Sequence, residues 1–200
     1  SNVNYGNKYF NDDQKRIISC TINEIRFINV YVPNGEAVGS EKYIYKIDWL
    51  KSIIKLVKKN RVHKFFYASS SSIYGNSKNF NESSKFKEPT SIYGASKLCN
   101  EIIASTYNYL YNFPIVCLRF FTVYGPWGRP DMAIFSFTKN ILLNKKINVF
   151  NKGKLIRDFT YIDDIVDGVF SLIKKPSKKS IPYEIFNIGN GSPKKLLDYL

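Results

Sequence analysis

The chain has 200 residues, of which 44% are hydrophobic and 23% charged, a balance typical of one or two folded globular domains. Its net charge is +14, but the 30 basic residues comprise 24 Lys and only 6 Arg, beside 20 Asn. Nucleic-acid surfaces usually recruit Arg for bidentate contacts. The composition therefore indicates a basic solvated exterior, and we expect no nucleic-acid partner.

Several other classes are excluded by residue usage. The single His63 and the widely separated Cys20, Cys99 and Cys117 provide no metal-ligand spacing and no disulfide framework. We therefore expect no metal and a reducing, cytoplasmic compartment. The longest uncharged run, residues 102–118, contains Pro114 and several polar residues, so we expect no membrane span. The first residues include neither Met nor an apolar signal, and we interpret the chain as a piece of a longer one.

Hydrophobic periodicity predicts the elements in chain order. A β hairpin over residues 16–32 is expected to turn at Asn23-Glu24. After residue 50, helical and strand patterns alternate, which favours an α/β fold with a parallel sheet. The predicted elements are a helix at 48–60, a strand at 64–68 ending in four serines, a helix at 90–112, a strand at 115–121, helical residues up to 146, a short strand around Val149, a helix at 163–174 and a strand at 185–188.

One residue pair on the second helix suggests acid–base chemistry. Tyr93 and Lys97 are four residues apart and therefore share a helix face. A free phenol ionises near pH 10, and an ammonium group one turn away favours the phenolate, which can then accept a hydroxyl proton. The serine cluster that ends the preceding strand can hydrogen-bond the same oxygen. Chance also supplies this spacing, as it does for Tyr74 and Lys78 in a turn, so the spacing alone favours a surface helix with a solvated Tyr and Lys.

Five segments extend this pair into a family pattern. From about residue 53 to 200 the chain resembles the extended short-chain dehydrogenase/reductase family of NAD-dependent nucleotide-sugar epimerases and dehydratases. Within that family it is most similar to UDP-glucuronate 4-epimerases. The matching segments are YASSSSIYG (67–75), SIYGASKLCNE (91–101), LRFFTVYGPWGRPDMA (118–133), GKLIRDFTYIDDI (153–165) and FNIGNGSP (186–193).

The resemblance implies a role for each matching position. Tyr93 corresponds to the catalytic base and Lys97 to its partner, and both contact NAD. Ser70 corresponds to the catalytic Ser/Thr. The implied contacts to a UDP-sugar are Ser71 and Ser72 beside it, Thr122 and Arg129 near a hexuronate carboxylate, and Arg157 at the UDP phosphates.

The family's cofactor-binding turn has no counterpart here. Its Gly-x-x-Gly-x-x-Gly spacing occurs nowhere among the 11 glycines, and no acidic residue follows at the expected distance. The resemblance therefore implies a partial Rossmann-like parallel sheet, without the amino-terminal nucleotide-binding half, preceded by a β hairpin.

The first fifty residues resemble a different family. The runs NVNYGNKYFNDDQKRIIS and IRFINVYVPNGEAVGSEKYIYKIDWL are similar to the middle of exonuclease III-type abasic-site endonucleases. Tyr31 matches a tyrosine near their scissile phosphate, although an ordinary strand tyrosine explains it better. Their Mg²⁺ ligands and catalytic His are absent, so we reject phosphodiester hydrolysis. We interpret residues 1–50 and 53–200 as fragments of two genes, joined between Lys46 and Asn60.

The implied function is NAD-dependent 4-epimerisation of a UDP-sugar, of the UDP-glucuronate to UDP-galacturonate type, through a 4-keto intermediate. The intact parent is expected to be a homodimer. A UDP-sugar dehydratase or decarboxylase of the same family is the alternative, but a dehydratase would need an Asp-Glu pair where this chain has Ser71-Ser72. A DNA-repair nuclease and an inert chimeric fragment are the other hypotheses. We expect the chain as given to be inactive.

Overall fold

A computed structural model describes residues 2–60, 62–77, 79–84, 88–149, 153, 155–175 and 182–199. Contacts divide the chain into two units, residues 1–62 and 63–200. Each unit is described separately below.

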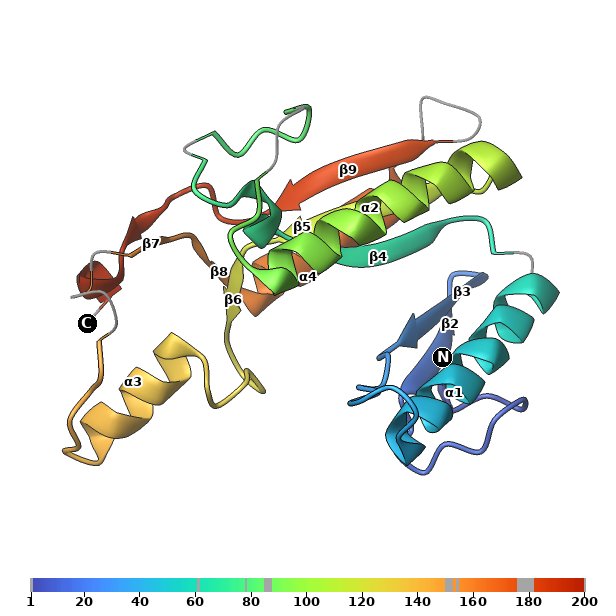
Figure 1. Cartoon of the computed structure of the whole chain (residues 1–200), viewed down its shortest axis with the longest axis horizontal. Helices are drawn as coiled ribbons and strands as arrows, with labels where there is room; N and C mark the ends of the chain where they lie inside the picture. Colours follow the sequence, from blue (N-terminus) through green and yellow to red (C-terminus); the bar gives the residue numbers. More distant parts are fainter. Residues whose placement is uncertain are drawn as a thin grey trace. The chain divides into compact units, whose positions relative to one another are not determined.

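The first unit is a small antiparallel sheet followed by a helix. Strands β1 (Asn4–Tyr5), β2 (Ile17–Ile22) and β3 (Ile25–Val30) pair in that order, and Figure 1 shows them in blue. Asn23 and Glu24 have φ of 47° and 66°, as a two-residue hairpin turn of matching twist requires. The predicted hairpin and its turn are confirmed.

Helix α1 (Glu41–Lys59) begins seven residues before the predicted start. The Ser40 side chain accepts a hydrogen bond from the Tyr43 backbone N–H (3.1 Å), which caps the helix there. Trp49 is fully buried and donates its indole N–H to Asp12 (3.1 Å), which also accepts from the Tyr45 hydroxyl (2.6 Å). The predicted join between Lys46 and Asn60 lies inside this continuous helix, and its position stays a prediction.

The second unit contains the parallel sheet. Strands β4 (Phe65–Ser70), β5 (Ile115–Phe120) and β9 (Tyr183–Ile188) pair in the order β4-β5-β9. The register aligns Ser70 with Phe120 and Phe120 with Ile188, so the three strands end at one edge. Five consecutive residues of β5 are buried, as expected of a central parallel strand. The predicted architecture, a partial parallel sheet preceded by a hairpin, is confirmed.

Two helices connect these strands. The 3-10 turn η1 (Ser71–Tyr74) follows β4, and helix α2 (Ile92–Tyr111) then leads to β5. Helix α4 (Ile162–Lys174) precedes β9. Figure 1 shows α2, in green, running along the sheet.

A smaller layer lies beyond the ends of β5 and β9. Its strands were not predicted, because each has only two or three residues, too few to show a period. They are β6 (Thr122–Tyr124) parallel to β8 (Phe159–Tyr161), and β7 (Ile156–Arg157) antiparallel to β10 (Lys194–Lys195), with helix α3 (Ala133–Leu142) and the 3-10 turn η3 (Leu196–Tyr199) beside them.

The predicted strand around Val149 is wrong: among the described residues, which here extend to 149, none of those near Val149 lies in a strand. Ile147 and Val149 pack as loop residues against the core of Phe137, Phe159 and Leu196. Their apolar alternation is therefore satisfied by burial, without a neighbouring strand. In the described part of the chain, no helix is long and apolar enough to cross a membrane.

Candidate active site

The carboxyl end of β4 presents the predicted catalytic serine. Ser70 is the last strand residue and caps η1: its hydroxyl accepts from the Ser72 backbone N–H (3.2 Å) and donates to the Ser72 hydroxyl (3.1 Å). Ser70 is buried, whereas Ser71 and Ser72 are half-buried. The three serines therefore form one hydroxyl-rich turn, with Ser70 fixed by local hydrogen bonds.

The start of α2 packs directly on that turn. A Cβ on Gly94 would lie 2.6 Å from the Ser72 carbonyl oxygen and 3.0 Å from Pro89, so only glycine permits this approach. Ser91 caps the helix by accepting from the Gly94 N–H (3.1 Å). The neighbouring Tyr93 is thereby placed beside η1. Its side chain stays 56% exposed, and its hydroxyl has no hydrogen-bond partner among the described residues.

Lys97 links the tyrosine to the serine strand. Its ammonium group donates to the Ala68 carbonyl (2.9 Å), two residues before Ser70, and lies 5.7 Å from the centroid of the Tyr93 ring. The structure therefore brings Ser70, Tyr93 and Lys97 to the junction of β4 and α2. The competing pair cannot be compared, because Lys78 lies outside the described residues; its partner Tyr74 is buried.

Beneath this junction lies a buried ion pair that the sequence analysis missed. Arg119 on β5 is 0% exposed and Glu101 on α2 is 4% exposed. The guanidinium donates to both carboxylate oxygens, at 2.9 and 2.7 Å, and also to the Tyr74 hydroxyl at 2.7 Å. Ser69 donates to the same carboxylate at 2.6 Å. A signal was present, since Glu101 and Arg119 are the two charges that bound the long uncharged run.

The ionisation of this pair follows from its contacts. Burial alone would raise the pKa of Glu101, but the hydrogen bonds from Arg119 and Ser69 outweigh it and hold the pKa below its usual value. Burial likewise disfavours the Arg119 cation, but its hydrogen bonds to Glu101 and Tyr74 raise its pKa. Burial raises the pKa of the adjacent Cys117 thiol to about 12. The pair is therefore charged at neutral pH, and the thiol beside it is protonated.

Three of the predicted substrate contacts lie elsewhere in the second unit, whereas Ser71 and Ser72 lie beside Ser70. Thr122 is half-buried at the start of β6 and donates its backbone N–H to the Asp158 carbonyl (3.1 Å). Arg129 is exposed and forms a bidentate contact with Asp131 (3.0 and 2.5 Å), and Arg157 donates to the Ile156 carbonyl (2.9 Å). These hydrogen bonds are local, and none of them joins these three residues to Ser70, Tyr93 or Lys97.

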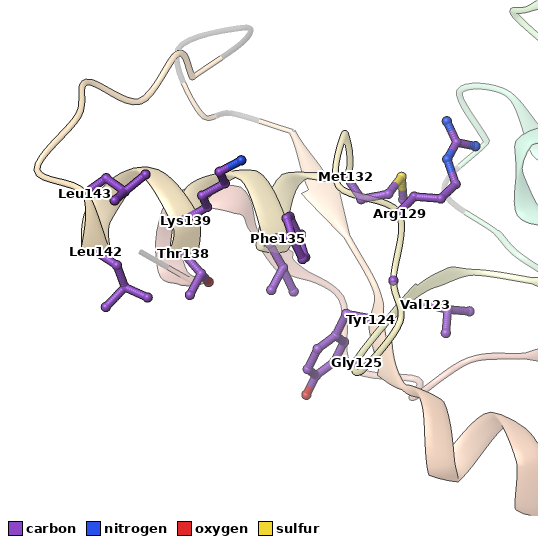
Figure 2. Close-up of a pocket in the computed structure, with 12 residues that line it drawn as sticks. Val123, Tyr124, Gly125, Arg129, Met132, Phe135, Thr138, Lys139, Leu142 and Leu143 are labelled. Carbon is purple, nitrogen blue, oxygen red and sulfur yellow. The ribbon is translucent and has the colours of Figure 1, made fainter.

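An open cavity of about 600 Å³ lies between α3 and the loop after β6. Figure 2 shows Leu142 and Leu143 at one end and Arg129 at the other, with its guanidinium directed away from α3. Met132 and Phe135 make much of the wall apolar. The cavity therefore combines an apolar surface with a cation at its rim.

Comparisons with known proteins agree on one family. The model of the NAD dependent epimerase/dehydratase family matches residues 36–189. Protein CapI of Staphylococcus aureus is 45% identical over 165 residues, which cover 74% of this chain and 49% of CapI. UDP-glucuronate 4-epimerase 1 of Arabidopsis thaliana is 50% identical over 141 residues, covering 64% and 33%.

A solved structure extends the agreement to the fold. UDP-glucuronic acid 4-epimerase from Bacillus cereus, in complex with UDP-glucuronic acid and NAD, aligns with a TM-score of 0.66 and 33% identity. The alignment covers 83% of this chain and 54% of that one. The chain thus spans about half the length of the curated relatives it matches.

The endonuclease resemblance of residues 1–50 finds no support in these comparisons. The family match begins at residue 36, inside the segment assigned to that resemblance. Tyr31 lies one residue beyond β3, is 73% exposed, and has the Arg16 guanidinium 5.4 Å from its ring centroid. These contacts are those of an ordinary surface tyrosine.

Proposed function

The chain belongs to the NAD dependent epimerase/dehydratase family, and we propose that its second unit carries the catalytic edge of a UDP-glucuronate 4-epimerase. The observation that carries this proposal is the junction of β4 and α2. There the Lys97 ammonium is tied to the serine strand at 2.9 Å, with the exposed Tyr93 ring beside it. Relatives named as UDP-glucuronate 4-epimerases support the choice of substrate.

The residues at this junction have complementary tasks. Tyr93 removes the proton of the sugar 4-hydroxyl and later returns it to the 4-keto oxygen. The Lys97 ammonium stabilises the negative charge that Tyr93 carries meanwhile. Ser70 donates a hydrogen bond to the same sugar oxygen once its hydroxyl proton turns away from the Ser72 hydroxyl. When bound, NAD would accept the C4 hydride and give it back on the other face, so the reaction has no net redox change.

The described residues fit one end of that cofactor. An ammonium group carries three protons, and the Ala68 carbonyl takes only one of those on Lys97, which leaves two for ribose hydroxyls. The exposed Tyr93 lies on the same helix face. The glycine-rich turn that holds the pyrophosphate in this family does not occur in the 200 residues.

An acidic sugar suits the cation near the open cavity. Arg129 forms a bidentate pair with the Asp131 carboxylate, which supports the proposal that its guanidinium binds a hexuronate carboxylate in exchange for Asp131. We propose that Thr122 assists there, that Ser71 and Ser72 line the sugar beside Ser70, and that Arg157 meets the UDP phosphates. Ser71-Ser72 disfavours a dehydratase, which would need an Asp-Glu pair at that place.

We propose further that the chain by itself is inactive and that the whole enzyme is a homodimer located in the cytoplasm. Helix α2 supports the dimer, because it exposes Ile102, Ile103, Tyr107 and Leu110 along its length. Light scattering on the hybrid described next would reveal the assembly.

The test examines cofactor binding and the chemistry of the proposed catalytic residues separately. Ligand binding to the native state raises the midpoint of thermal unfolding. Because the chain has no glycine-rich turn to bind the pyrophosphate, we expect millimolar NAD⁺ to leave its midpoint unchanged. A hybrid in which residues 36–200 replace the matching segment of CapI should bind NAD⁺ and convert UDP-glucuronate to UDP-galacturonate, followed by NMR.

In that hybrid, Tyr93→Phe should lower kcat by about 10²–10⁴-fold. Tyr109→Phe is the matched control, since Tyr109 is an exposed tyrosine of the same helix, at 84%, and is not among the residues that support the dimer. A hybrid that binds NAD⁺ but leaves UDP-glucuronate unchanged would refute the proposed substrate, and full activity in Tyr93→Phe would refute the proposed base.

A further inference from the structure

Three functional groups of α2 follow one another at single-turn intervals. Tyr93, Lys97 and Glu101 are four residues apart and therefore share one face of the helix. The first two lie at the proposed catalytic junction, and the third is buried. Whatever fixes Glu101 around the helix axis therefore also fixes the direction of Tyr93 and Lys97.

Glu101 is held by all three strands of the sheet. Its carboxylate accepts from Ser69 on β4 (2.6 Å) and from Arg119 on β5 (2.9 and 2.7 Å). Its backbone carbonyl accepts from the Tyr183 hydroxyl on β9 (2.9 Å). Ser69 directly precedes the proposed catalytic Ser70, so one carboxylate joins the serine strand to the tyrosine helix.

Arg119 carries the connection to the other side of the serine turn. It donates to the hydroxyl of Tyr74, the last residue of η1, at 2.7 Å, and Tyr74 donates to the Asn187 side chain on β9 at 2.8 Å. Because Ser69 binds Glu101 just before the turn and Tyr74 at its end binds Arg119, the chain on both sides of the turn is linked to the same ion pair.

We propose that Glu101, acting through Arg119 and Ser69, is a positioning residue that sets the rotation of α2 and so keeps Tyr93 and Lys97 opposite Ser70. The inference rests on the proposed function for the roles of those three residues. Apolar packing is non-directional, whereas a bidentate carboxylate–guanidinium pair fixes an orientation. In some proteins a buried polar or ionic group specifies one arrangement of the fold even though it adds little net stability.

The precision required is small in angle. Side chains reach about 6 Å from a helix axis, so a rotation of about 10° moves such a group by about 1 Å. A misplacement of about 1 Å can cost about 100-fold in rate. A loose Glu101 would therefore affect turnover before it affected folding.

The decisive variant is Ser69→Ala, which cuts the link between Glu101 and the serine strand and leaves the ion pair in place. Glu101→Gln is less useful, because it leaves the Arg119 charge buried without a counter-ion and risks unfolding the chain. Cys117→Ala is the matched control: the Cys117 thiol also contacts the Glu101 carboxylate, at 3.5 Å, but from β5. Both variants remove one small buried group next to the same carboxylate.

The first measurement uses the full chain without cofactor. Among its 15 tyrosines, labelled with ¹³C in the ring, the Tyr93 signal is the one lost in Tyr93→Phe. We expect this signal to split, or to broaden at least twofold, in Ser69→Ala and to remain unchanged in Cys117→Ala. An unchanged Tyr93 signal in Ser69→Ala, or equal broadening in both variants, would overturn the proposal.

The second measurement uses the CapI hybrid. We expect Ser69→Ala to lower kcat about tenfold with an unchanged KM for UDP-glucuronate, and Cys117→Ala to retain both parameters. A KM effect without a kcat effect would overturn positioning of the catalytic groups. If the hybrid has no epimerase activity at all, the proposed function fails, and the tyrosine signal still decides whether Glu101 sets the helix.

Discussion

Removing Arg119 tests the energetics of the buried pair directly. In Arg119→Met, the Glu101 carboxylate stays 4% exposed and keeps Ser69, but it loses two hydrogen bonds at 2.9 and 2.7 Å and its counter-charge. Breaking a buried pair from one side typically costs about 3–5 kcal/mol. Because whole domains are stable by only about 5–15 kcal/mol, we expect the free energy of unfolding of the second unit to fall by about a fifth or more.

The double variant supplies the control. When Glu101→Gln is added, no buried charge remains, and the Gln carbonyl still accepts from Ser69. Replacing both members of such a pair is often close to neutral, so the double variant should recover to within about 2 kcal/mol of the original chain. Urea unfolding followed by circular dichroism gives the free energies and the m-values. A loss below about 1 kcal/mol in Arg119→Met, or no recovery in the double variant, would refute the reasoning.

The pH dependence gives a second signature of the same pair. Since the folded chain holds the pKa of Glu101 below its usual value, the pair stabilises the fold above about pH 4.3, the ordinary value for a free Glu. That stabilisation is lost as pH falls through the lowered pKa. In Arg119→Met, burial without a cation instead favours the protonated carboxyl. The difference in the free energy of unfolding between the original chain and Arg119→Met should therefore become smaller between pH 7 and pH 4. A constant difference would contradict this account.

Three further predictions concern single positions. Gly94→Ala should lower the free energy of unfolding in urea by about 1–3 kcal/mol, because its Cβ would lie 2.6 Å from the Ser72 carbonyl oxygen. Gly168→Ala in α4 is the control and should raise the free energy of unfolding by up to about 1 kcal/mol, because the nearest atom to its Cβ would be 3.7 Å away. A loss of the same size at both positions would contradict the close approach of Gly94. Burial raises the pKa of Cys117 to about 12. Its contribution to the free energy of unfolding is therefore fully present below the free-thiol pKa of about 8.5 and falls above it by up to about 1.4 kcal/mol per pH unit. Cys117→Ala should remove this decrease, measured from urea midpoints at pH 9 and pH 10. Glu24→Gly should raise the stability of the first unit by about 1 kcal/mol in thermal unfolding, because glycine adopts a φ of 66° without a Cβ penalty, and a lower midpoint would refute the strain at that turn.

Local chemistry made much of the fold predictable. The turn at Asn23-Glu24, the serines that end β4 and the start of α2 within two residues of its predicted position all depend on neighbours in the sequence. Helix α1 shows the limit of periodicity, because its first turn depends on the Ser40 cap, whereas the apolar face becomes obvious only after Asp48. Around Val149 the alternation of apolar residues predicted a strand that the structure does not contain, because Ile147 and Val149 pack from a loop against the core of Phe137, Phe159 and Leu196.

The buried pair could not be predicted in the same way. Glu101 and Arg119 are 18 residues apart, and their contact exists only because α2 crosses back over the sheet to the start of β5. From the sequence, a charge at the edge of an apolar run is equally compatible with a solvated helix end or strand end. The pairing rule that buried charges need partners identifies the two residues as candidates, but only the crossover geometry joins them.

The contacts that hold the proposed catalytic edge lie within one of the two units. Lys97 binds Ala68, Gly94 approaches Ser72, and Glu101 binds Ser69 and Arg119, so every partner lies in the second unit. Among the described residues, these contacts involve no residue before position 63. Cofactor binding differs, because the pyrophosphate of a dinucleotide needs backbone N–H groups from a glycine-rich turn that this sequence does not contain. Under the proposed function, the positioning of Tyr93 and the binding of the dinucleotide pyrophosphate therefore depend on different parts of the sequence.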